Sequence, residues 1–100
     1  MVANAAKSKP RIMIVDDEAS LRKVLKAMLQ RAGYNIETAQ SGQAALAQLA
    51  KAEASAEAGF DLVICDIRMP EMSGMTLLEK LVNTYADLPV IMLTAHGPST

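Results

Sequence analysis

Three short apolar runs, each ending abruptly at polar or acidic residues, constrain the fold of this 100-residue chain more than any other feature. They occupy residues 11–15, 61–65 and 89–93. A continuous apolar run of this length is typical of a strand that is buried on both faces of a sheet. A fourth run at residues 34–39 is weaker and alternates between apolar and polar side chains, as expected of a strand near the sheet edge.

The segments between these runs carry apolar residues at the spacing of an α-helix. Gly33 follows the first segment, where a left-handed residue ends many helices, and Ser41 and Ser73 precede the next two as N-caps. Residues 51–58 read as a helical extension or a solvated loop that ends at Gly59. The predicted apolar stripes are Leu21, Val24, Leu25, Met28 and Leu29 in the first helix, Ala45, Leu46 and Leu49 in the second, and Met75, Leu78, Leu81, Val82 and Tyr85 in the third.

Strands and helices therefore alternate along the chain, which predicts an α/β fold with a doubly wound parallel sheet and right-handed crossovers. We expect one domain at residues 11–100 and a disordered lead-in at residues 1–10. In folds of this kind, ligands bind outside the carboxyl ends of the strands, at the point where the strand order reverses.

Charge and cysteine content exclude several other classes of protein. The net charge is -1 with acidic and basic residues interspersed, so neither a nucleic-acid-binding nor a membrane-binding surface is expected. No apolar run approaches the ~18 residues of a membrane span, and residues 1–10 lack the apolar stretch of a signal peptide. The single cysteine, Cys65, has no partner for an internal disulfide and fits a reducing compartment, so we predict a cytoplasmic protein.

Polar and acidic residues stand at the carboxyl ends of three predicted strands. Asp16 and Asp17 follow the first strand, Asp66 follows the third, and Thr94 follows the fourth. If the first and third strands are neighbours, a strand spacing of ~4.8 Å brings the carboxylates within reach of one cation. Like charges ~4 Å apart repel by about 4 kcal/mol at an effective dielectric near 20, and a hard divalent cation such as Mg²⁺ removes that cost. A carboxylate that shares this ion with a phosphate donor can attack phosphorus.

Three motifs, in order along the chain, resemble the receiver domain of two-component response regulators. They are Ile-Val-Asp-Asp-Glu at residues 14–18, Asp-Ile-Arg-Met-Pro at 66–70 with Gly74 eight residues after the aspartate, and Leu-Thr-Ala at 93–95. The match spans residues 11–96, and the last two motifs are similar to receivers attached to sigma-54-dependent regulators. The resemblance implies a flavodoxin-like sheet with strand order 2-1-3-4.

The same resemblance implies a role for each site residue. Asp66 would be the phosphoacceptor, receiving a phosphoryl group from a phosphohistidine of a sensor histidine kinase and switching an output such as transcription. Asp17 would ligate Mg²⁺ directly, Asp16 mainly through water, and Arg68 through its backbone carbonyl. The hydroxyl of Thr94 would sense the phosphoryl group. Such a domain catalyses at most its own phosphorylation and dephosphorylation, so no enzyme is predicted.

One departure from the family pattern concerns the end of the chain. The pattern continues with a fifth strand that ends in a lysine paired with the phosphoryl group, and no lysine of this sequence stands in that place. We therefore expect the fifth strand and the last helices to be missing, so that the sequence is a fragment or a receiver that signals differently. The alternative function is a degenerate receiver that acts as a phosphorylation-independent interaction or dimerisation module.

The predicted partners follow from the same features. A flat, apolar fourth strand at the sheet edge is a template for self-association. Contact with nucleic acid is expected only through a domain outside this chain, and no contact with a membrane is expected.

Two other site chemistries fit the residues less well. A phosphatase of the Asp-x-Asp type needs a second acid where Arg68 stands. A flavin or nucleotide binder needs Gly, Ser or Thr in the first loop, where Asp16, Asp17 and Glu18 would repel phosphate. His96 is read as a solvated loop residue rather than a general base.

Overall fold

The protein is represented by a computed structural model that describes residues 9–55, 59–68 and 72–93. Thr94, His96 and most of the predicted lead-in lie outside the described residues. The elements are β1 (Arg11–Val15), α1 (Ala19–Arg31), β2 (Asn35–Ala39), α2 (Gly42–Ala54), β3 (Leu62–Asp66), α3 (Gly74–Thr84) and β4 (Val90–Leu93). This is the predicted alternation of strands and helices.

The strands form a four-stranded parallel sheet in the order β2-β1-β3-β4, as predicted. The register pairs Val15 at the end of β1 with Ala39 on one side and with Cys65 on the other. The order reverses between β1 and β3, because β2 lies on one side of β1 and β3 on the other. The carboxyl ends of β1 and β3 therefore define the predicted ligand-binding edge.

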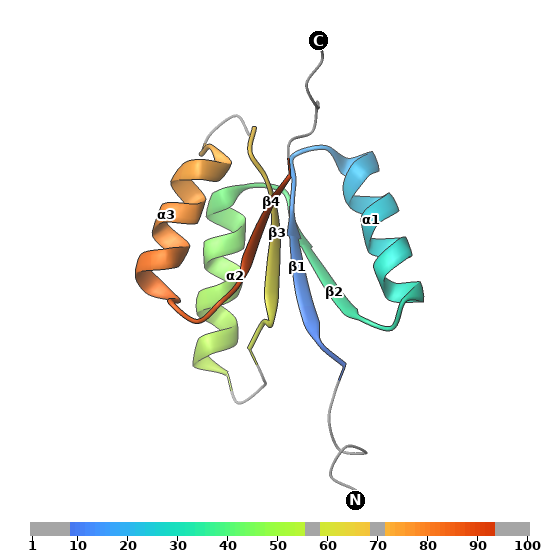
Figure 1. The fold of residues 1–100 in the computed structure, drawn as a ribbon, viewed down its shortest axis with the longest axis horizontal. Coiled ribbons are helices and arrows are strands. Elements are labelled where there is room, and N and C mark those ends of the chain that lie inside the picture. The colour runs from blue at the N-terminus through green and yellow to red at the C-terminus, as the bar shows by residue number, and fades with distance from the viewer. Residues whose placement is uncertain (1–8, 56–58, 69–71, 94–100) are drawn as a thin grey trace, which may run out of the picture.

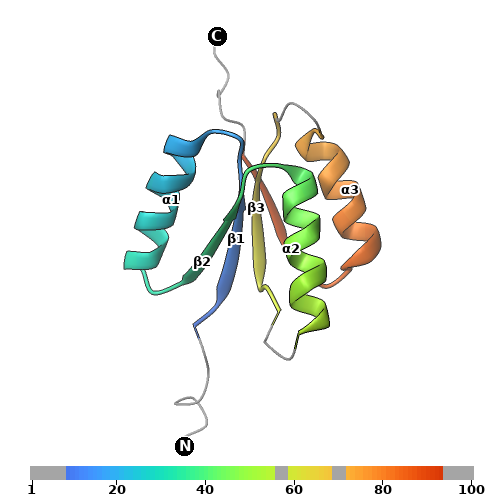
Figure 2. The ribbon, with the colours of Figure 1, turned by 180° about the vertical axis from the view of Figure 1, so that it is seen from behind.

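Helices cover both faces of the sheet, with α1 on one face and α2 and α3 on the other (Figures 1 and 2). Alternate residues of β1 serve the two faces, since successive side chains of a strand point in opposite directions. Met13 and Val15 belong to the larger core under α2 and α3, and Ile12 and Ile14 belong to a smaller core under α1. Within the described ranges, no helix is long and apolar enough to cross a membrane.

The predicted stripe of α1 is only partly buried. Leu25 and Leu29 pack against the smaller core, but Val24 is 54% exposed and Met28 is 59% exposed. No residue of α1 is fully buried. The helix therefore packs on the sheet through Leu25 and Leu29, while the Val24 and Met28 edge of its apolar stripe faces solvent.

The predicted buried face of α3 was partly wrong. Leu81 is fully buried, but Met75 and Val82 are exposed, and Leu77 takes the place that the sequence analysis gave to them. The apolar residues of this helix extend around two flanks, so their spacing alone does not decide which flank faces the sheet. Gly74 decides it, because its close approach to the sheet places the residues three and seven positions later, Leu77 and Leu81, against the core.

The predicted helix ends are confirmed where the structure describes them. The hydroxyl oxygens of Ser41 and Ser73 accept hydrogen bonds from the backbone N–H groups three residues later. Gly33 has a φ of 105° just after α1, a left-handed conformation that strains other residues. Helix α2 extends into the ambiguous region after residue 51 and ends at Ala54.

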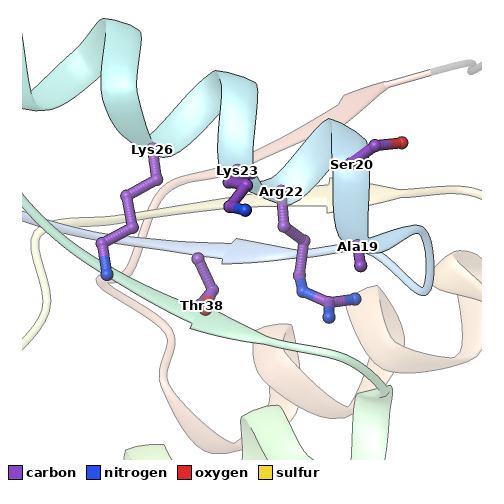
Figure 3. Close-up of a pocket in the computed structure, with 6 residues that line it drawn as sticks. All are labelled: Ala19, Ser20, Arg22, Lys23, Lys26 and Thr38. Carbon is purple, nitrogen blue, oxygen red and sulfur yellow. The ribbon is translucent and has the colours of Figure 1, made fainter.

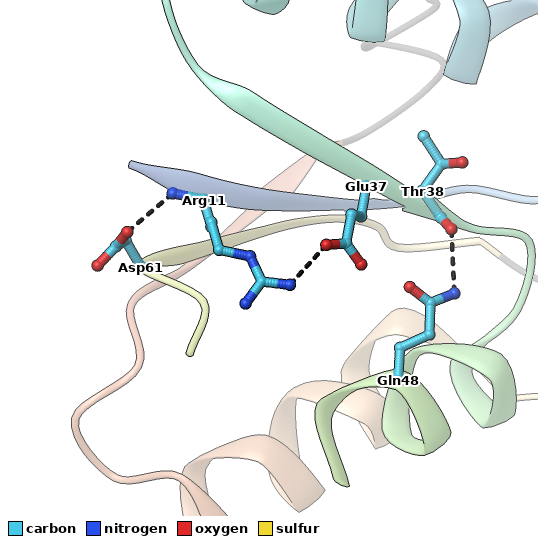
Figure 4. Close-up of polar contacts among 5 residues, drawn as sticks. All are labelled: Arg11, Glu37, Thr38, Gln48 and Asp61. Atoms are coloured by element: carbon cyan, nitrogen blue, oxygen red, sulfur yellow. Dashed lines mark hydrogen bonds and ion pairs between the residues drawn. The ribbon is translucent and has the colours of Figure 1, made fainter. Parts of the chain in front are cut away.

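Polar contacts outside the acidic cluster join neighbouring elements of the sheet (Figure 4). The backbone N–H of Arg11 donates to Asp61 Oδ2 at 2.8 Å, and its guanidinium donates to Glu37 Oε2 at 2.5 Å. On the neighbouring helix, Gln48 Nε2 donates to the backbone carbonyl of Thr38 at 3.1 Å. The Arg11 contacts tie β1 to β2 and to the start of β3 at the amino end of β1, whereas the Gln48 contact ties α2 to β2 near the carboxyl end of that strand.

Candidate functional site

The acidic residues lie where two neighbouring parallel strands end. Asp16 directly follows β1 and Asp66 is the last residue of β3, and Val15 pairs with Cys65 just before them. Hydrogen bonding continues past both strand ends: the N–H of Asp16 donates to the carbonyl of Ala39 at 3.1 Å, and the N–H of Ile67 donates to the carbonyl of Leu93 at 3.0 Å. The backbone therefore holds both carboxylates at one edge of the sheet.

Three of the predicted residues come together in one cluster. Asp16, Asp17 and Asp66 each offer a carboxylate oxygen, and these oxygens lie within 4.8 Å of one another. Asp16 is 2% exposed and Asp66 is 4% exposed, whereas Asp17 is exposed. Two carboxylates thus form the floor of the site and one forms its rim, open to solvent.

Each buried carboxylate is oriented by a backbone N–H two residues further along the chain. The N–H of Glu18 donates to Asp16 Oδ1 at 2.8 Å, and the N–H of Arg68 donates to Asp66 Oδ1 at 3.1 Å. One oxygen of each carboxylate is thereby engaged and the other remains for a ligand. The second contact also brings the Arg68 peptide next to the cluster, while the Arg68 side chain is exposed.

The cluster is electrostatically unfavourable without a cation. Burial raises the pKa of the Asp16 carboxyl above its usual 3.8, the hydrogen bond from the Glu18 N–H lowers it, and the charges of Asp66 and Asp17 raise it further. Hard oxygen donors packed this closely suit a divalent cation, which offsets their repulsion. The donor set therefore fits a metal ion of the Mg²⁺ type.

Cys65 lies directly beneath this cluster and does not take part in it chemically. The side chain is fully buried, and burial, followed by the charges of Asp66 and Asp16, raises the pKa of the thiol to about 12. Its Sγ lies 3.3 Å from the carbonyl oxygen of Asp66, as a weak donor. The thiol is therefore neutral near physiological pH and acts as a small apolar residue.

Gly74 closes the site from the α3 side. Its N–H donates to the carbonyl of Ile67 at 2.8 Å, which places the first turn of α3 against the end of β3. A Cβ at this position would lie 2.7 Å from Ile67 Cα and would also overlap the carbonyl oxygen of Asp66. The glycine eight residues after Asp66 is thus required by close backbone packing.

Arg22 is a site neighbour that the sequence analysis missed. Its Nη1 donates to the backbone carbonyl of Asp16 at 2.6 Å, and its side chain is half-buried. The available signal was a basic residue in the first turn of the helix that follows the acidic pair. Of the other predicted site residues, Thr94 lies outside the described residues.

A basic groove flanks the site but is distinct from the acidic cluster. It has a volume of about 540 Å³ between α1 and β2 (Figure 3). None of the predicted site residues lines it. Its lining consists of Ala19, Ser20, Arg22, Lys23, Lys26 and Thr38.

Known proteins share both the sequence motifs and the fold. The sequence matches the family described as the response regulator receiver domain over residues 12–100. The two-component response regulator ARR10 of Arabidopsis thaliana is 44% identical over 87 residues, which are 87% of this chain and 15% of ARR10. The transcriptional regulatory protein ZraR of Escherichia coli is 40% identical over 86 residues, which are 86% of this chain and 18% of ZraR. The chain thus spans less than a fifth of the length of these relatives.

Solved structures agree with this result. The response regulator TrrA of Thermotoga maritima, in complex with Mg²⁺-BeF, aligns with a TM-score of 0.78 and 39% identity over 88% of this chain and 71% of that chain. The complex of the histidine kinase ThkA with TrrA gives a TM-score of 0.75 and 39% identity over 91% of this chain and 75% of that chain. The chain belongs to the response regulator receiver domain family, and the predicted flavodoxin-like fold is confirmed.

Proposed function

We propose that this receiver domain accepts a phosphoryl group on Asp66, with a Mg²⁺ ion bound beside it. The observation that carries the proposal is the cluster of Asp16, Asp17 and Asp66, whose oxygens lie within 4.8 Å of one another at the carboxyl edge of the sheet. We assign the acceptor role to Asp66 because it begins the family motif Asp-Ile-Arg-Met-Pro at residues 66–70. Its Oδ1 is held by the N–H of Arg68, which leaves Oδ2 for attack.

The metal ligands divide between a buried floor and an exposed rim. We assign direct coordination to Asp17, Asp66 and the backbone carbonyl of Arg68, and a water-mediated contact to Asp16. When bound, Mg²⁺ would neutralise charge on the transferring phosphoryl group. The relative TrrA was solved with Mg²⁺-BeF, which supports this choice of ion.

The transfer requires one bond to form and one to break. A carboxylate oxygen of Asp66 forms a bond to phosphorus while the phosphorus–nitrogen bond to the donor histidine breaks. The bonding electron pair returns to the imidazole nitrogen of the donor, and the product on this chain is an acyl phosphate. Thr94 follows β4 in the sequence, and we propose its hydroxyl as the group that senses the phosphoryl oxygens.

The proposed donor is a sensor histidine kinase, and the proposed output is transcription. The complex of ThkA with TrrA supports a kinase as partner, and ZraR is named a transcriptional regulatory protein. We propose a cytoplasmic location, which fits both the proposed kinase donor and the proposed transcriptional output. Beyond its own phosphorylation and dephosphorylation we propose no enzymatic activity, and nucleic acid would be bound by another domain.

Incubation of the chain with Mg²⁺ and acetyl phosphate, followed by mass spectrometry, tests the proposal. We expect one added phosphoryl group on Asp66, stable in acid and labile in base, and lost in Asp66→Asn. The matched control is Asp61→Asn, an aspartate just before the opposite end of β3. A label on Ser73 or Thr76 instead of Asp66 would refute the mechanism. No label under any condition would favour the phosphorylation-independent interaction module.

A further inference from the structure

Arg22 connects α1 to the loop that carries the metal-binding acids. Its Nη1 donates to the carbonyl oxygen of Asp16 at 2.6 Å, across six residues of sequence. In Figure 3 its guanidinium extends from the first turn of α1 toward the loop after β1, while Lys26 lies further along the helix. The same loop contains the bond from the Glu18 N–H to the Asp16 carboxylate.

The contact is a hydrogen bond to the backbone and not an ion pair. In the part of the chain that the structure describes, the salt bridge joins Arg11 and Glu37, and Arg22 makes none with the clustered acids. Arg22 therefore acts on the site through the position of a carbonyl group.

We propose that Arg22 is a positioning residue of the metal site, whose hydrogen bond to Asp16 fixes the loop from which Asp16 and Asp17 reach the cation. This inference rests on the proposed function, because it concerns the same metal site. The bonded carbonyl belongs to the peptide that joins Asp16 to Asp17. Holding that peptide therefore orients both carboxylates.

Positioning and simple electrostatics predict opposite effects on metal affinity. Arg22 is a cation near a cation site, so through charge alone its removal should strengthen Mg²⁺ binding. If Arg22 acts by positioning, its removal leaves the loop less ordered in the metal-free protein. Binding of Mg²⁺ must then order the loop, and this entropic cost weakens the affinity. One hydrogen bond of this kind corresponds to about a three- to tenfold change in affinity.

The test compares Arg22→Met with Lys23→Met by calorimetric titration of MgCl₂ into the chain. Both variants lose one positive charge from α1, but Lys23 is exposed and makes no hydrogen bond or ion pair with the described residues of the loop. We expect about three- to tenfold weaker binding in Arg22→Met and unchanged or slightly tighter binding in Lys23→Met. Arg22→Lys, which keeps a donor and the charge, should recover most of the affinity.

Hydrogen exchange of the Glu18 amide in the metal-free protein gives an independent readout. We expect faster exchange in Arg22→Met than in Lys23→Met, because the loop loses its tether to α1. If Arg22→Met proves unfolded by circular dichroism, Arg22→Gln takes its place. The amide nitrogen of glutamine lies two bonds short of the position of Arg22 Nη1, so it does not reach the carbonyl of Asp16.

The outcomes separate this proposal from the proposed function. Equal or tighter Mg²⁺ binding in Arg22→Met, or unchanged exchange at Glu18, would overturn the role of Arg22. A native chain that binds no Mg²⁺ would overturn the metal site itself, while the exchange at Glu18 still decides whether Arg22 orders the loop.

Discussion

Replacing Gly74 with alanine adds one methyl group where α3 meets the end of β3. The new Cβ would lie 2.7 Å from Ile67 Cα and 2.9 Å from the carbonyl carbon of Asp66. Both neighbours are backbone atoms of the strand end, so neither moves away by a simple rotamer change. The first turn of α3 must therefore shift outward, which also disturbs the hydrogen bond from the Gly74 N–H to the Ile67 carbonyl.

The expected cost is a large part of the stability of a small domain. Overpacking costs about 1–3 kcal/mol, and a clash with backbone belongs at the upper end of that range. The gain in helix propensity from Gly to Ala is at most ~1 kcal/mol, and less at the first residue of a helix. A net loss of about 2–3 kcal/mol in the free energy of unfolding follows, against a total of roughly 5–15 kcal/mol for a domain of this size.

Two other glycines of the same chain serve as matched controls. No atom lies within 4 Å of a Cβ built on Gly59, and its φ lies outside the left-handed region, so Gly59→Ala should be neutral or slightly stabilising. Gly33 also has open space around it but a φ of 105°, so Gly33→Ala should cost about 1 kcal/mol through backbone strain alone. The three variants thus separate steric overlap, backbone strain and the substitution itself.

Urea unfolding followed by circular dichroism measures all three. With a urea dependence of about 1–3 kcal/mol/M, Gly74→Ala should lower the midpoint by roughly 1–2 M. A Gly74→Ala midpoint equal to that of Gly59→Ala would show that α3 does not press on Asp66 and Ile67. The argument for a required glycine at this site would then be refuted.

Three further predictions concern the acids and the sheet edge. Asp17→Ala should abolish Mg²⁺ binding measured by calorimetry, and Asp16→Ala should only weaken it; native affinity in Asp17→Ala would contradict its direct ligation. Because the pKa of Asp16 is raised in the folded chain, the metal-free protein should gain stability as the pH falls from neutral toward 3.8. Mg²⁺ affinity should fall over the same range, because protons compete with the cation for the carboxylates. Urea midpoints and calorimetric titrations at each pH measure the two trends, and an opposite trend in either would contradict the reasoning. Ile91 is 47% exposed on β4, the edge strand of the described sheet, and we propose that two copies of the chain pair along this strand. Light scattering over a tenfold dilution should show a dimer, and Ile91→Lys should abolish it. A monomer at every concentration would contradict the pairing.

Much of the fold could be predicted because it follows from local patterns. Buried parallel strands are continuous apolar runs, and the positions of Ser41, Ser73 and Gly33 mark helix ends by their own chemistry. The acids could be predicted too, because parallel strands place their carboxyl ends at one edge. Both inferences need only chain order and element type.

The errors arose where packing decides between equivalent patterns. Helix α3 offers apolar residues on two flanks, and the choice of Leu77 over Met75 and Val82 depends on the approach of Gly74 to the strand. Arg22 was missed for a similar reason, since a basic residue in the first helical turn is common and its partner is a backbone carbonyl. Residue types alone do not show which backbone carbonyl a side chain will bond, nor which flank of a helix will face the sheet.

The incomplete burial of α1 has a consequence for how the site responds to ligands. Helices α2 and α3 each bury residues completely, whereas α1 buries none, so α1 should open with the lowest free energy of the three helices. The acids come from both sides of this difference: Asp66 belongs to the firmly packed half, and Asp17 leads into α1. A cation that binds both acids lowers the population of the state in which α1 is detached from the sheet. By thermodynamic reciprocity, any contact that holds α1 against the sheet raises the affinity for the cation. A protein that binds the outer surface of α1 would then change the cation affinity of the site, and thereby the reactivity of Asp66, without contacting Asp66.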